Sequence, residues 1–310
     1  SSSIIELCII APNTLNNFNG YIYIRMFVKK HCTLKKNRLS FTCLTKKSLI
    51  RVAKNLSKVT KKRIPINRKN LRKTYNLMSK IIKAQYKCNT EICWMKIKKL
   101  FDGLSSKDKK IFRKYFKPNL PSDVQKDYTA WLSNYDIDEV MEGLKLEHND
   151  FHYYQATPID FHKCSVSDLC SIDIREHHKK NKKKIGIVFN TDKSSGPGQH
   201  WIAMYIDMLG INLENEGIYY FDSYSGSVPQ QIKDLIGKIK KQGEDLNMDF
   251  LVANNNRSIQ KNNYACGYYC MHFIENMLMG ANFQDYSKTL SDSLMGNYRE
   301  TCYINPDEIK

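Results

Sequence analysis

The chain lacks the long apolar run that a membrane-spanning helix needs. Such a helix takes about 20 predominantly apolar residues. The most apolar stretches near the start, residues 4–10 and 21–28, are much shorter, and the charged residues Glu6 and Arg25 interrupt them. The first stretch also lacks the basic start and the small-residue cleavage site of a signal peptide. We therefore expect neither a membrane span nor export through a signal peptide.

Pairs of cysteines with metal-ligand spacing are also missing, although the chain has 10 cysteines. No two of them form a Cys-x-x-Cys pair. The nearest approaches are Cys88 with Cys93, and Cys164 with Cys170 close to His162, and their spacings differ from those of usual zinc sites. We therefore predict no metal site. Without an export signal a reducing compartment is expected, with these cysteines as ordinary buried or surface thiols.

Acidic residues are scarce in the first part of the chain. Residues 1–120 contain 30 Lys or Arg and 4 Asp or Glu, whereas residues 121–310 contain 19 and 27, which together give the net charge of +18. This shift predicts two domains, a basic N-terminal arm at 1–120 and a globular domain at 121–310. Clustered lysines are typical either of a solvated surface or of a polyanion-binding one. No DNA-reading motif is present, so any nucleic-acid contact should be independent of sequence.

Apolar periodicity predicts a mainly helical arm. We expect helices over residues 45–58, 67–85, 93–104 and 108–116, the first beginning at Thr45, and a break at Pro65. Residues 21–28 could form a strand. Pro118 and Pro121 mark the expected linker to the second domain.

The second domain mixes strands and helices. A helix capped by Ser133 or Asn134 should run to Gly143, and residues 148–161 and 177–184 should be loops. Strands are expected over 185–190, 201–208, 217–224 and 249–253, and helices over 229–241, 268–279 and 286–298. This order predicts an α+β fold with an antiparallel-leaning sheet flanked by helices.

Cys266 is the candidate nucleophile, because it stands between a polar loop and an apolar helix. The start of a helix favours an anion, and so favours the reactive thiolate form of cysteine. Gly267 follows at once and would let a substrate chain come close. Cys270, one turn further on, is expected to be a buried core thiol.

Thiol catalysis also needs a base, a group that orients the base, and donors for the developing oxyanion. His200 begins an apolar strand, and Asp222 closes the next one. If these strands pair as an antiparallel hairpin, the two residues become neighbours. Gln260 precedes Cys266 closely enough to offer its amide to the same carbonyl. Each residue alone has a structural explanation, and Asp207 is a rival orienting acid. His272 is interpreted as structural.

These residues carry a resemblance to a known group of enzymes. The runs Gly198-Gln199-His200-Trp201, Phe221-Asp222-Ser223 and Gln260-x5-Cys266-Gly267 resemble the ubiquitin-like-protein-specific and adenovirus-type cysteine proteases. Within that group the chain is most similar to polyprotein-processing proteases of large DNA viruses, such as the African swine fever virus and giant-virus enzymes. Trp131-Leu132 followed by Ile137 resembles the start of the same domain.

The resemblance implies a papain-like cysteine protease core with the basic arm as an addition. It implies Cys266 as nucleophile, His200 as base, Asp222 as the orienting group and Gln260 in the oxyanion hole. Trp201, Gly267 and Trp131 are then expected to line the substrate groove.

The same resemblance implies a substrate and a setting. The substrate would be a viral structural polyprotein cut after glycine during virion maturation, with a SUMO-like or ubiquitin-like conjugate as the alternative and acyl transfer as a third reaction. No cofactor is required, although adenovirus-type relatives use DNA, which the arm could bind as an activating polyanion. The expected setting is the virion and the infected host cytoplasm, with the nucleus as the alternative.

Overall fold

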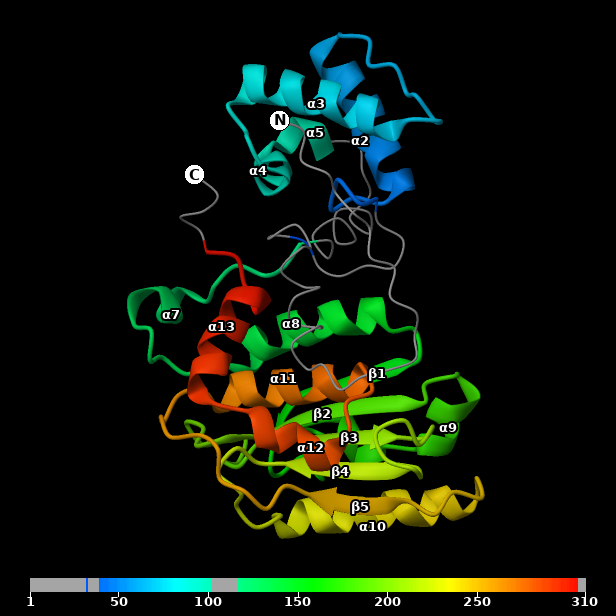
Figure 1. The fold of residues 1–310 in the computed structure, drawn as a ribbon, viewed down its shortest axis with the longest axis vertical. Helices are drawn as coiled ribbons and strands as arrows, with labels where there is room; N and C mark the ends of the chain where they lie inside the picture. Colours follow the sequence, from blue (N-terminus) through cyan, green and yellow to red (C-terminus); the bar gives the residue numbers. More distant parts are fainter. Residues whose placement is uncertain (1–31, 33–38, 102–115, 306–310) are drawn as a thin grey trace, which may run out of the picture.

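The computed structural model describes residue 32 and residues 39–101 and 116–305. The predicted strand at 21–28 and nearly all of the predicted helix at 108–116 lie outside these residues. The arm lies at one end of the molecule and the sheet at the other (Figure 1).

Four helices build the described part of the arm: α2 (Lys46–Thr60), α3 (Leu71–Tyr86), α4 (Glu91–Lys96) and α5 (Lys98–Phe101). Helix α2 begins where the sequence predicted, because the Thr45 side chain accepts the Ser48 backbone N–H. The apolar faces of these helices pack on one another in a core of their own, centred on buried residues such as Leu49, Leu56 and Ile82. The predicted helix at 93–104 is instead the short pair α4 and α5. The domain boundary at 120/121 stays a prediction.

A five-stranded sheet forms the centre of the second part. Its strands are β1 (Phe151–Pro158), β2 (Lys184–Asn190), β3 (Trp201–Asp207), β4 (Gly217–Phe221) and β5 (Leu251–Asn254), in that spatial order. The pairs β2–β3 and β3–β4 are antiparallel, whereas β1–β2 and β4–β5 are parallel. The predicted α+β class is confirmed. The sheet is mixed rather than mostly antiparallel, because both outer strands join it by long crossovers.

Helices cover both faces of the sheet (Figure 1). One face carries α8 (Asn134–Glu147), α11 (Cys266–Leu278), α12 (Phe283–Tyr286) and α13 (Asp292–Cys302), and the other carries α9 (Ile174–Lys179) and α10 (Gln230–Glu244). Strand β3 is buried on both faces, which explains its nearly continuous apolar sequence. Its alternate residues enter two separate hydrophobic clusters, with Tyr205 in one and Ile206 in the other. The second part also contains the short elements α7 (Ser122–Lys126), η1 (Asp168–Ser171) and η2 (Ser287–Thr289).

The ends of the second part meet beside the arm. Asn119 and Ile304 form an isolated parallel bridge, in which Leu120 donates to the Ile304 carbonyl and Ile304 donates to the Pro118 carbonyl, each at 2.9 Å. Ile304 is also buried in the core of the arm. The segment after α13 therefore ties the predicted linker to the arm helices.

Three segments of the second part also differ from the sequence predictions. Residues 151–158, predicted as loop, form β1, because their partner strand lies about 30 residues further on and no local pattern reveals a parallel pairing. The first residues of the predicted loop at 177–184 belong to α9, which ends at Lys179. Asp173 caps this helix by accepting the Arg175 backbone N–H. The single last helix is broken, because Leu290 is extended and Ser291 starts α13 as a new N-cap.

Three disulfides correct the prediction that the cysteines are free thiols. They join Cys32 to Cys43, Cys88 to Cys93, and Cys164 to Cys170, whose Cα atoms lie 5.2–5.4 Å apart. A disulfide needs two Cα atoms at about this separation, and the spacing of cysteines in the sequence does not reveal which ones approach so closely. Cys266, Cys270 and Cys302 are free and buried.

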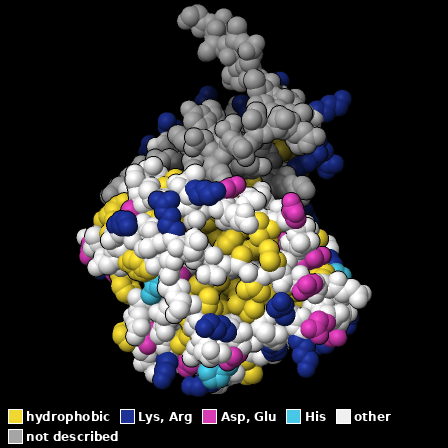
Figure 2. Space-filling model, turned by 60° about the horizontal axis from the view of Figure 1, so that its bottom comes forward, with side chains coloured by type: hydrophobic (Ala, Val, Ile, Leu, Met, Phe, Trp, Pro, Cys, Tyr) yellow, Lys and Arg dark blue, Asp and Glu magenta, His cyan; other side chains and the backbone are white. Residues whose placement is uncertain are grey.

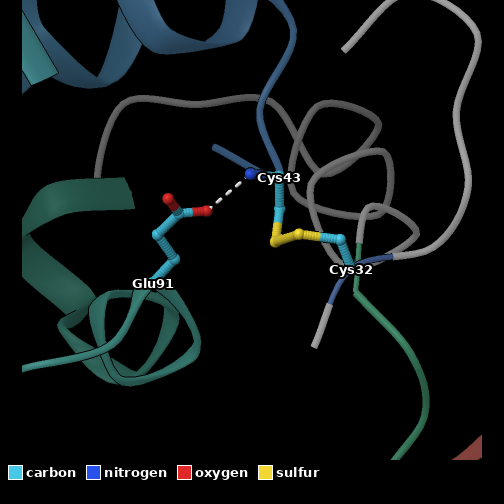
Figure 3. A group of neighbouring side chains, drawn as sticks. All are labelled: Cys32, Cys43 and Glu91. Atoms are coloured by element: carbon cyan, nitrogen blue, oxygen red, sulfur yellow. Dashed lines mark hydrogen bonds between the residues drawn. A yellow bond between two sulfur atoms is a disulfide. The ribbon is translucent and has the colours of Figure 1, made fainter. Parts of the chain in front are cut away.

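The Cys32–Cys43 disulfide lies beside Glu91, whose carboxylate accepts the Cys43 backbone N–H at 2.7 Å (Figure 3). Among the described residues these three side chains are the only group of three potential metal ligands that meet. Because the two sulfurs are bonded to each other, they offer no thiolate to a metal ion.

Within the described residues no helix is long and apolar enough to cross a membrane. Hydrophobic side chains do gather in a patch on the face that Figure 2 turns toward the reader, with charged side chains around it. On the edge strand β5, Leu251 and Val252 are exposed.

Candidate active site

The hairpin of β3 and β4 brings His200 and Asp222 together, as the sequence predicted. Ala203 pairs with Phe221, so His200, just before β3, lies beside the residues that follow β4. The Nε2 atom of His200 lies 2.7 Å from Oδ1 of Asp222, and their side chains are 16% and 7% exposed. The imidazole is therefore held by a buried carboxylate while one side stays accessible.

Asp222 is held by several donors besides His200. Its carboxylate accepts the backbone N–H groups of Tyr224 and Gly226, each at 2.9 Å. Its own backbone is paired with the side chain of buried Asn255, which accepts from the Asp222 N–H at 2.9 Å and donates to the Asp222 carbonyl at 2.7 Å. Asn255 follows β5, and sequence reasoning missed it because only the parallel β4–β5 pairing places it here.

The electrostatics of the pair favour an imidazolium beside a carboxylate. Burial lowers the pKa of His200, but hydrogen bonding to Asp222 and to Cys266 outweighs burial and raises it to about 9. Burial alone would raise the pKa of Asp222, whereas the His200 hydrogen bond and charge lower it below its ordinary value. A histidine in this setting stays protonated at neutral pH.

Cys266 is the first residue of α11 and is 2% exposed. It faces the histidine, since the two side chains interact. Because Nε2 of His200 is directed to Asp222, Nδ1 is the ring atom left for the thiol. The first turn of the helix adds unpaired N–H groups and the positive end of the helix dipole. The thiol thus lies between a protonated imidazole and the N-terminus of a helix.

Three other candidate residues have structural surroundings: Cys270, His272 and Asp207. Cys270 is buried, and this burial raises its pKa well above the ordinary value. His272 Nδ1 lies 2.7 Å from the hydroxyl of buried Tyr286. Asp207 is at the opposite end of β3 from His200, where it accepts three backbone N–H groups of the following turn. Asp207 therefore does not orient His200.

Gln260 is buried with its amide group oriented by partners on both sides. Its Oε1 accepts the Ser223 hydroxyl at 2.7 Å, and its Nε2 donates to the Asn262 carbonyl at 2.8 Å. The Ser223 carbonyl also accepts the backbone N–H groups of Ile259 and Gln260. The residue after Asp222 thus anchors the loop that leads to Cys266.

That loop, residues 260–265, is held to α13 and to the start of α11. Asp292 of α13 accepts the backbone N–H groups of Lys261 and Asn262 at 3.1 and 2.9 Å. The Asn262 side chain accepts the N–H groups of Tyr264 and Ala265, just before Cys266. Sequence reasoning missed Asn262 and Asp292. Asn262 could have been noticed, because asparagine is common in turns.

The three predicted substrate contacts fall in two different places. Trp131 is 43% exposed, whereas Trp201 is buried and donates through its indole N–H to the Leu132 carbonyl at 2.9 Å. Both tryptophans and Gly198 line a cleft of about 2440 Å³ that also runs along β1 and reaches residues of the arm. His200 and Cys266 do not line this cleft, although Trp201, the residue after His200, does.

Gly267 lies against residues that the sequence did not predict as its neighbours. A Cβ atom at this position would lie 3.2 Å from Cδ1 of Leu132 and 3.4 Å from Ile137. The glycine therefore allows α11 to pack closely on Leu132 and on Ile137 of α8. Its contact with a substrate chain stays a prediction.

Comparison with known proteins relates this domain to one family of proteases. Residues 161–309, a little under half of the chain, match the model of the C-terminal catalytic domain of the Ulp1 protease family. The resemblance seen in the sequence is thereby confirmed, and these findings support a cysteine peptidase.

Two curated viral proteins and one solved structure are similar to the chain. A protein of Acanthamoeba polyphaga mimivirus named as a thiol protease is 30% identical over 189 residues, which are 59% of this chain and 60% of that protein. A cysteine protease of African swine fever virus is 26% identical over 186 residues, 55% of this chain and 67% of its own length. The crystal structure of an African swine fever virus protease superimposes with a TM-score of 0.64 at 20% identity, covering 90% of this chain and 97% of that one. That likeness shows a shared fold.

Proposed function

We propose that this protein is a cysteine endopeptidase with Cys266 as nucleophile, His200 as general acid and base, and Asp222 as the group that orients the imidazole. One observation carries the proposal. His200 interacts with Asp222 on one side and with the thiol at the start of α11 on the other. This is the order of groups that thiol catalysis requires.

The reaction follows from this geometry. The Cys266 thiolate attacks the scissile carbonyl carbon, a C–S bond forms, and the carbonyl oxygen takes the negative charge. When the C–N bond breaks, the His200 imidazolium gives its proton to the leaving amine. The neutral imidazole then takes a proton from water, which attacks the thioester and releases the acid. Asp222 keeps Nε2 engaged throughout, so that Nδ1 faces the reacting atoms.

The oxyanion would be stabilised by Gln260 and by the backbone N–H of Cys266. The Gln260 amide has two N–H bonds, and the Asn262 carbonyl accepts one of them. Nε2 also has a long contact, 3.4 Å, with Oδ1 of Asn262, and the second N–H would exchange this contact for the oxyanion. Preorganised donors of this kind contribute about 100- to 1000-fold in rate.

The proposed substrate is a viral structural polyprotein cut after glycine. Trp131, Trp201 and Gly198 border a cleft that reaches the residue next to His200, and the indole rings offer apolar surface to an extended substrate chain. The similar proteins with curated names come from large DNA viruses. We accordingly propose the virion and the infected host cytoplasm as its place of action.

A second candidate substrate is a SUMO-like or ubiquitin-like conjugate. A similar African swine fever virus protein, 26% identical over 186 residues, is named as a SUMO-1 cysteine protease. Such a substrate also presents glycines before the scissile bond, so the two candidates differ in the folded part of the substrate.

A peptide-library cleavage profile tests the proposal, with Cys266→Ala as the control. We expect cleavage after glycine by the unmodified chain and none by the variant. The rate on a SUMO C-terminal reporter, compared with the rate on a Gly-Gly-x peptide, decides between the substrates. Cleavage by Cys266→Ala at the full rate would contradict the proposed nucleophile.

We also propose that the arm binds a nucleic acid without sequence preference. Residues 39–101 contain 18 Lys or Arg and a single carboxylate, that of Glu91, which is buried. No exposed carboxylate of the described arm therefore offsets these charges. Lys80, Lys83 and Lys87 are exposed and border a hollow of about 430 Å³ at the end of α3. This spacing places three ammonium groups along one side of a helix.

A salt titration of duplex DNA binding tests this second proposal. Replacing Lys80, Lys83 and Lys87 by glutamate should weaken binding and make it less dependent on salt. The matched control is the same change at Lys233, Lys240 and Lys241, which are exposed on α10. Little binding at low salt, or equal loss in both triple variants, would contradict a site on the arm. Adding the DNA to the peptide assay shows whether it also activates cleavage.

A further inference from the structure

Tyr224 connects the two halves of the candidate site. Its ring lies against the imidazole of His200, with a centroid distance of 4.9 Å and an angle of 36° between the planes. Its hydroxyl donates to the Asn262 carbonyl at 2.5 Å, although the two residues are 38 positions apart. The side chain thus reaches from the turn after β4, which holds Asp222, to the loop that holds Gln260.

The Asn262 carbonyl is a shared acceptor. It receives the Tyr224 hydroxyl and also Nε2 of Gln260, at 2.8 Å. Two further groups of Asn262 are also hydrogen-bonded. Its N–H is bonded to Asp292, and its side-chain oxygen accepts the N–H groups that precede Cys266. Nε2 of Gln260 also has a longer contact, 3.4 Å, with Oδ1 of Asn262. The direction of the Asn262 carbonyl, its nearer acceptor, therefore constrains where the second N–H of Gln260 points.

We propose that Tyr224 is a positioning residue for the oxyanion donor Gln260, acting through the Asn262 carbonyl. The inference rests on the proposed cysteine peptidase function and goes beyond it, because it assigns a role to a residue outside the triad and the oxyanion hole. The hydroxyl and Nε2 of Gln260 donate to the same carbonyl oxygen, so the hydroxyl helps to fix the acceptor of the amide. If its hydrogen bond is lost, the peptide can rotate, the amide follows it, and the second N–H leaves the position of the oxyanion.

The environment of Tyr224 argues against a purely packing role. Its side chain is 40% exposed, whereas the core tyrosines of this domain are nearly fully buried. It belongs to none of the hydrophobic clusters among the described residues. Its side chain contacts the ring of His200 and the Asn262 carbonyl, and its backbone N–H donates to the Asp222 carboxylate. All three lead to groups of the candidate site.

A double-mutant cycle tests the inference. Tyr224→Phe keeps the ring on His200 and removes only the hydroxyl. We expect kcat to fall about five-fold with KM changed less than two-fold, as the loss of one hydrogen bond in the transition state alone implies. In a Gln260→Ala background the same change should cost nothing further, because the group that it positions is gone. The matched control is Tyr298→Phe, which removes a hydroxyl bonded to Glu275 outside the site.

Inhibitor binding can be measured for variants whose turnover is too slow to assay. A peptide aldehyde ending in glycine adds the Cys266 sulfur to its carbonyl carbon, and the thiol proton moves to the carbonyl oxygen. Its dissociation constant should rise about five-fold in Tyr224→Phe and stay unchanged when Gln260 is already alanine.

Three results separate the possibilities. Equal losses in both backgrounds, or no loss in Tyr224→Phe, would overturn the role of Tyr224 in an active enzyme. A similar loss in Tyr298→Phe would show a general effect on stability and would also overturn it. A chain that neither cleaves any library peptide nor binds the aldehyde contradicts the proposed function itself.

Discussion

The Ser223 hydroxyl donates a hydrogen bond to Oε1 of Gln260 at 2.7 Å, across 37 positions of sequence. Ser223 directly follows the carboxylate that orients His200, and Gln260 begins the loop that ends at Cys266. Because the oxygen of the Gln260 amide is held here, its nitrogen must face the other way. One short contact therefore decides which end of the amide the reacting carbonyl can meet.

Replacing Ser223 by alanine should lower kcat about ten-fold. The amide then keeps only its contact with Asn262 and can turn, so a donor fixed for the transition state is lost. Steady-state kinetics on a Gly-Gly-x peptide measure the effect. Ser57→Ala is the matched control, since it removes a hydroxyl bonded to the Lys62 carbonyl in the arm. An unchanged kcat for Ser223→Ala would show that this hydrogen bond does not orient the amide during catalysis.

The two cysteines of α11 should respond in opposite ways. Cys266→Ala should abolish cleavage and leave the melting temperature almost unchanged. Cys270→Ala should retain cleavage and reduce the free energy of unfolding by about 1–2 kcal/mol, because it leaves a small cavity in a fully buried position. Activity assays and thermal unfolding of both variants provide the comparison. Activity that depends on Cys270 instead would make the assignment of the nucleophile wrong.

The pH profile of kcat/KM should reveal the His200–Asp222 pair. The imidazolium is lost as pH rises through about 9, so activity should fall on that side. Asp222→Asn keeps an oxygen near Nε2 but removes the charge, and should move the alkaline limb down by roughly one unit. Asp222→Ala should reduce activity far more, because nothing then orients the ring. An alkaline limb that stays in place in Asp222→Asn would contradict a charge effect of Asp222.

The same shift has a consequence for stability. A group whose pKa is higher in the folded state stabilises it most at low pH. His200 should therefore contribute its full share to the free energy of unfolding below about pH 6.5, its unfolded value. This share should disappear as pH rises through about 9. Urea unfolding at pH 6 and pH 10, with His200→Ala as reference, measures the difference.

Asp292 should matter for catalysis although it lies on α13. Its carboxylate accepts the N–H groups of Lys261 and Asn262 and the hydroxyl of Tyr269. Asp292→Asn leaves one acceptor oxygen for these three donors, and we expect kcat to fall about ten-fold. Asp285→Asn is the control, because Asp285 forms only an exposed ion pair with Lys288, and such pairs contribute little. Equal kinetics for the two variants would remove Asp292 from the positioning of the loop.

The catalytic half of the chain could be predicted well because its signals are local. An apolar run after a polar loop marks the start of α11, and the ends of two apolar strands mark the positions of His200 and Asp222. A hairpin needs only a short connection, so the approach of these two residues followed from the strand order alone. Their 2.7 Å contact confirms that expectation.

Other features escaped prediction because they depend on contacts between distant segments. Strand β1 is defined by its parallel pairing with β2, and its own sequence does not show it. The Cys164–Cys170 disulfide depends on how the backbone turns between the two residues. The packing of Leu132 and Ile137 against Gly267 joins segments about 130 residues apart, and no local pattern in the sequence indicates it.

By itself the sequence determined the type of chemistry: which thiol lies at a helix start, which histidine and carboxylate end neighbouring strands, and where the basic charge lies. Only the tertiary structure decided how the amide of Gln260 is directed, through Ser223, Asn262, Asp292 and Tyr224. The reason is physical. Periodicity and helix signals come from neighbours along the chain, whereas the orientation of one side chain depends on hydrogen bonds from segments that folding alone brings together.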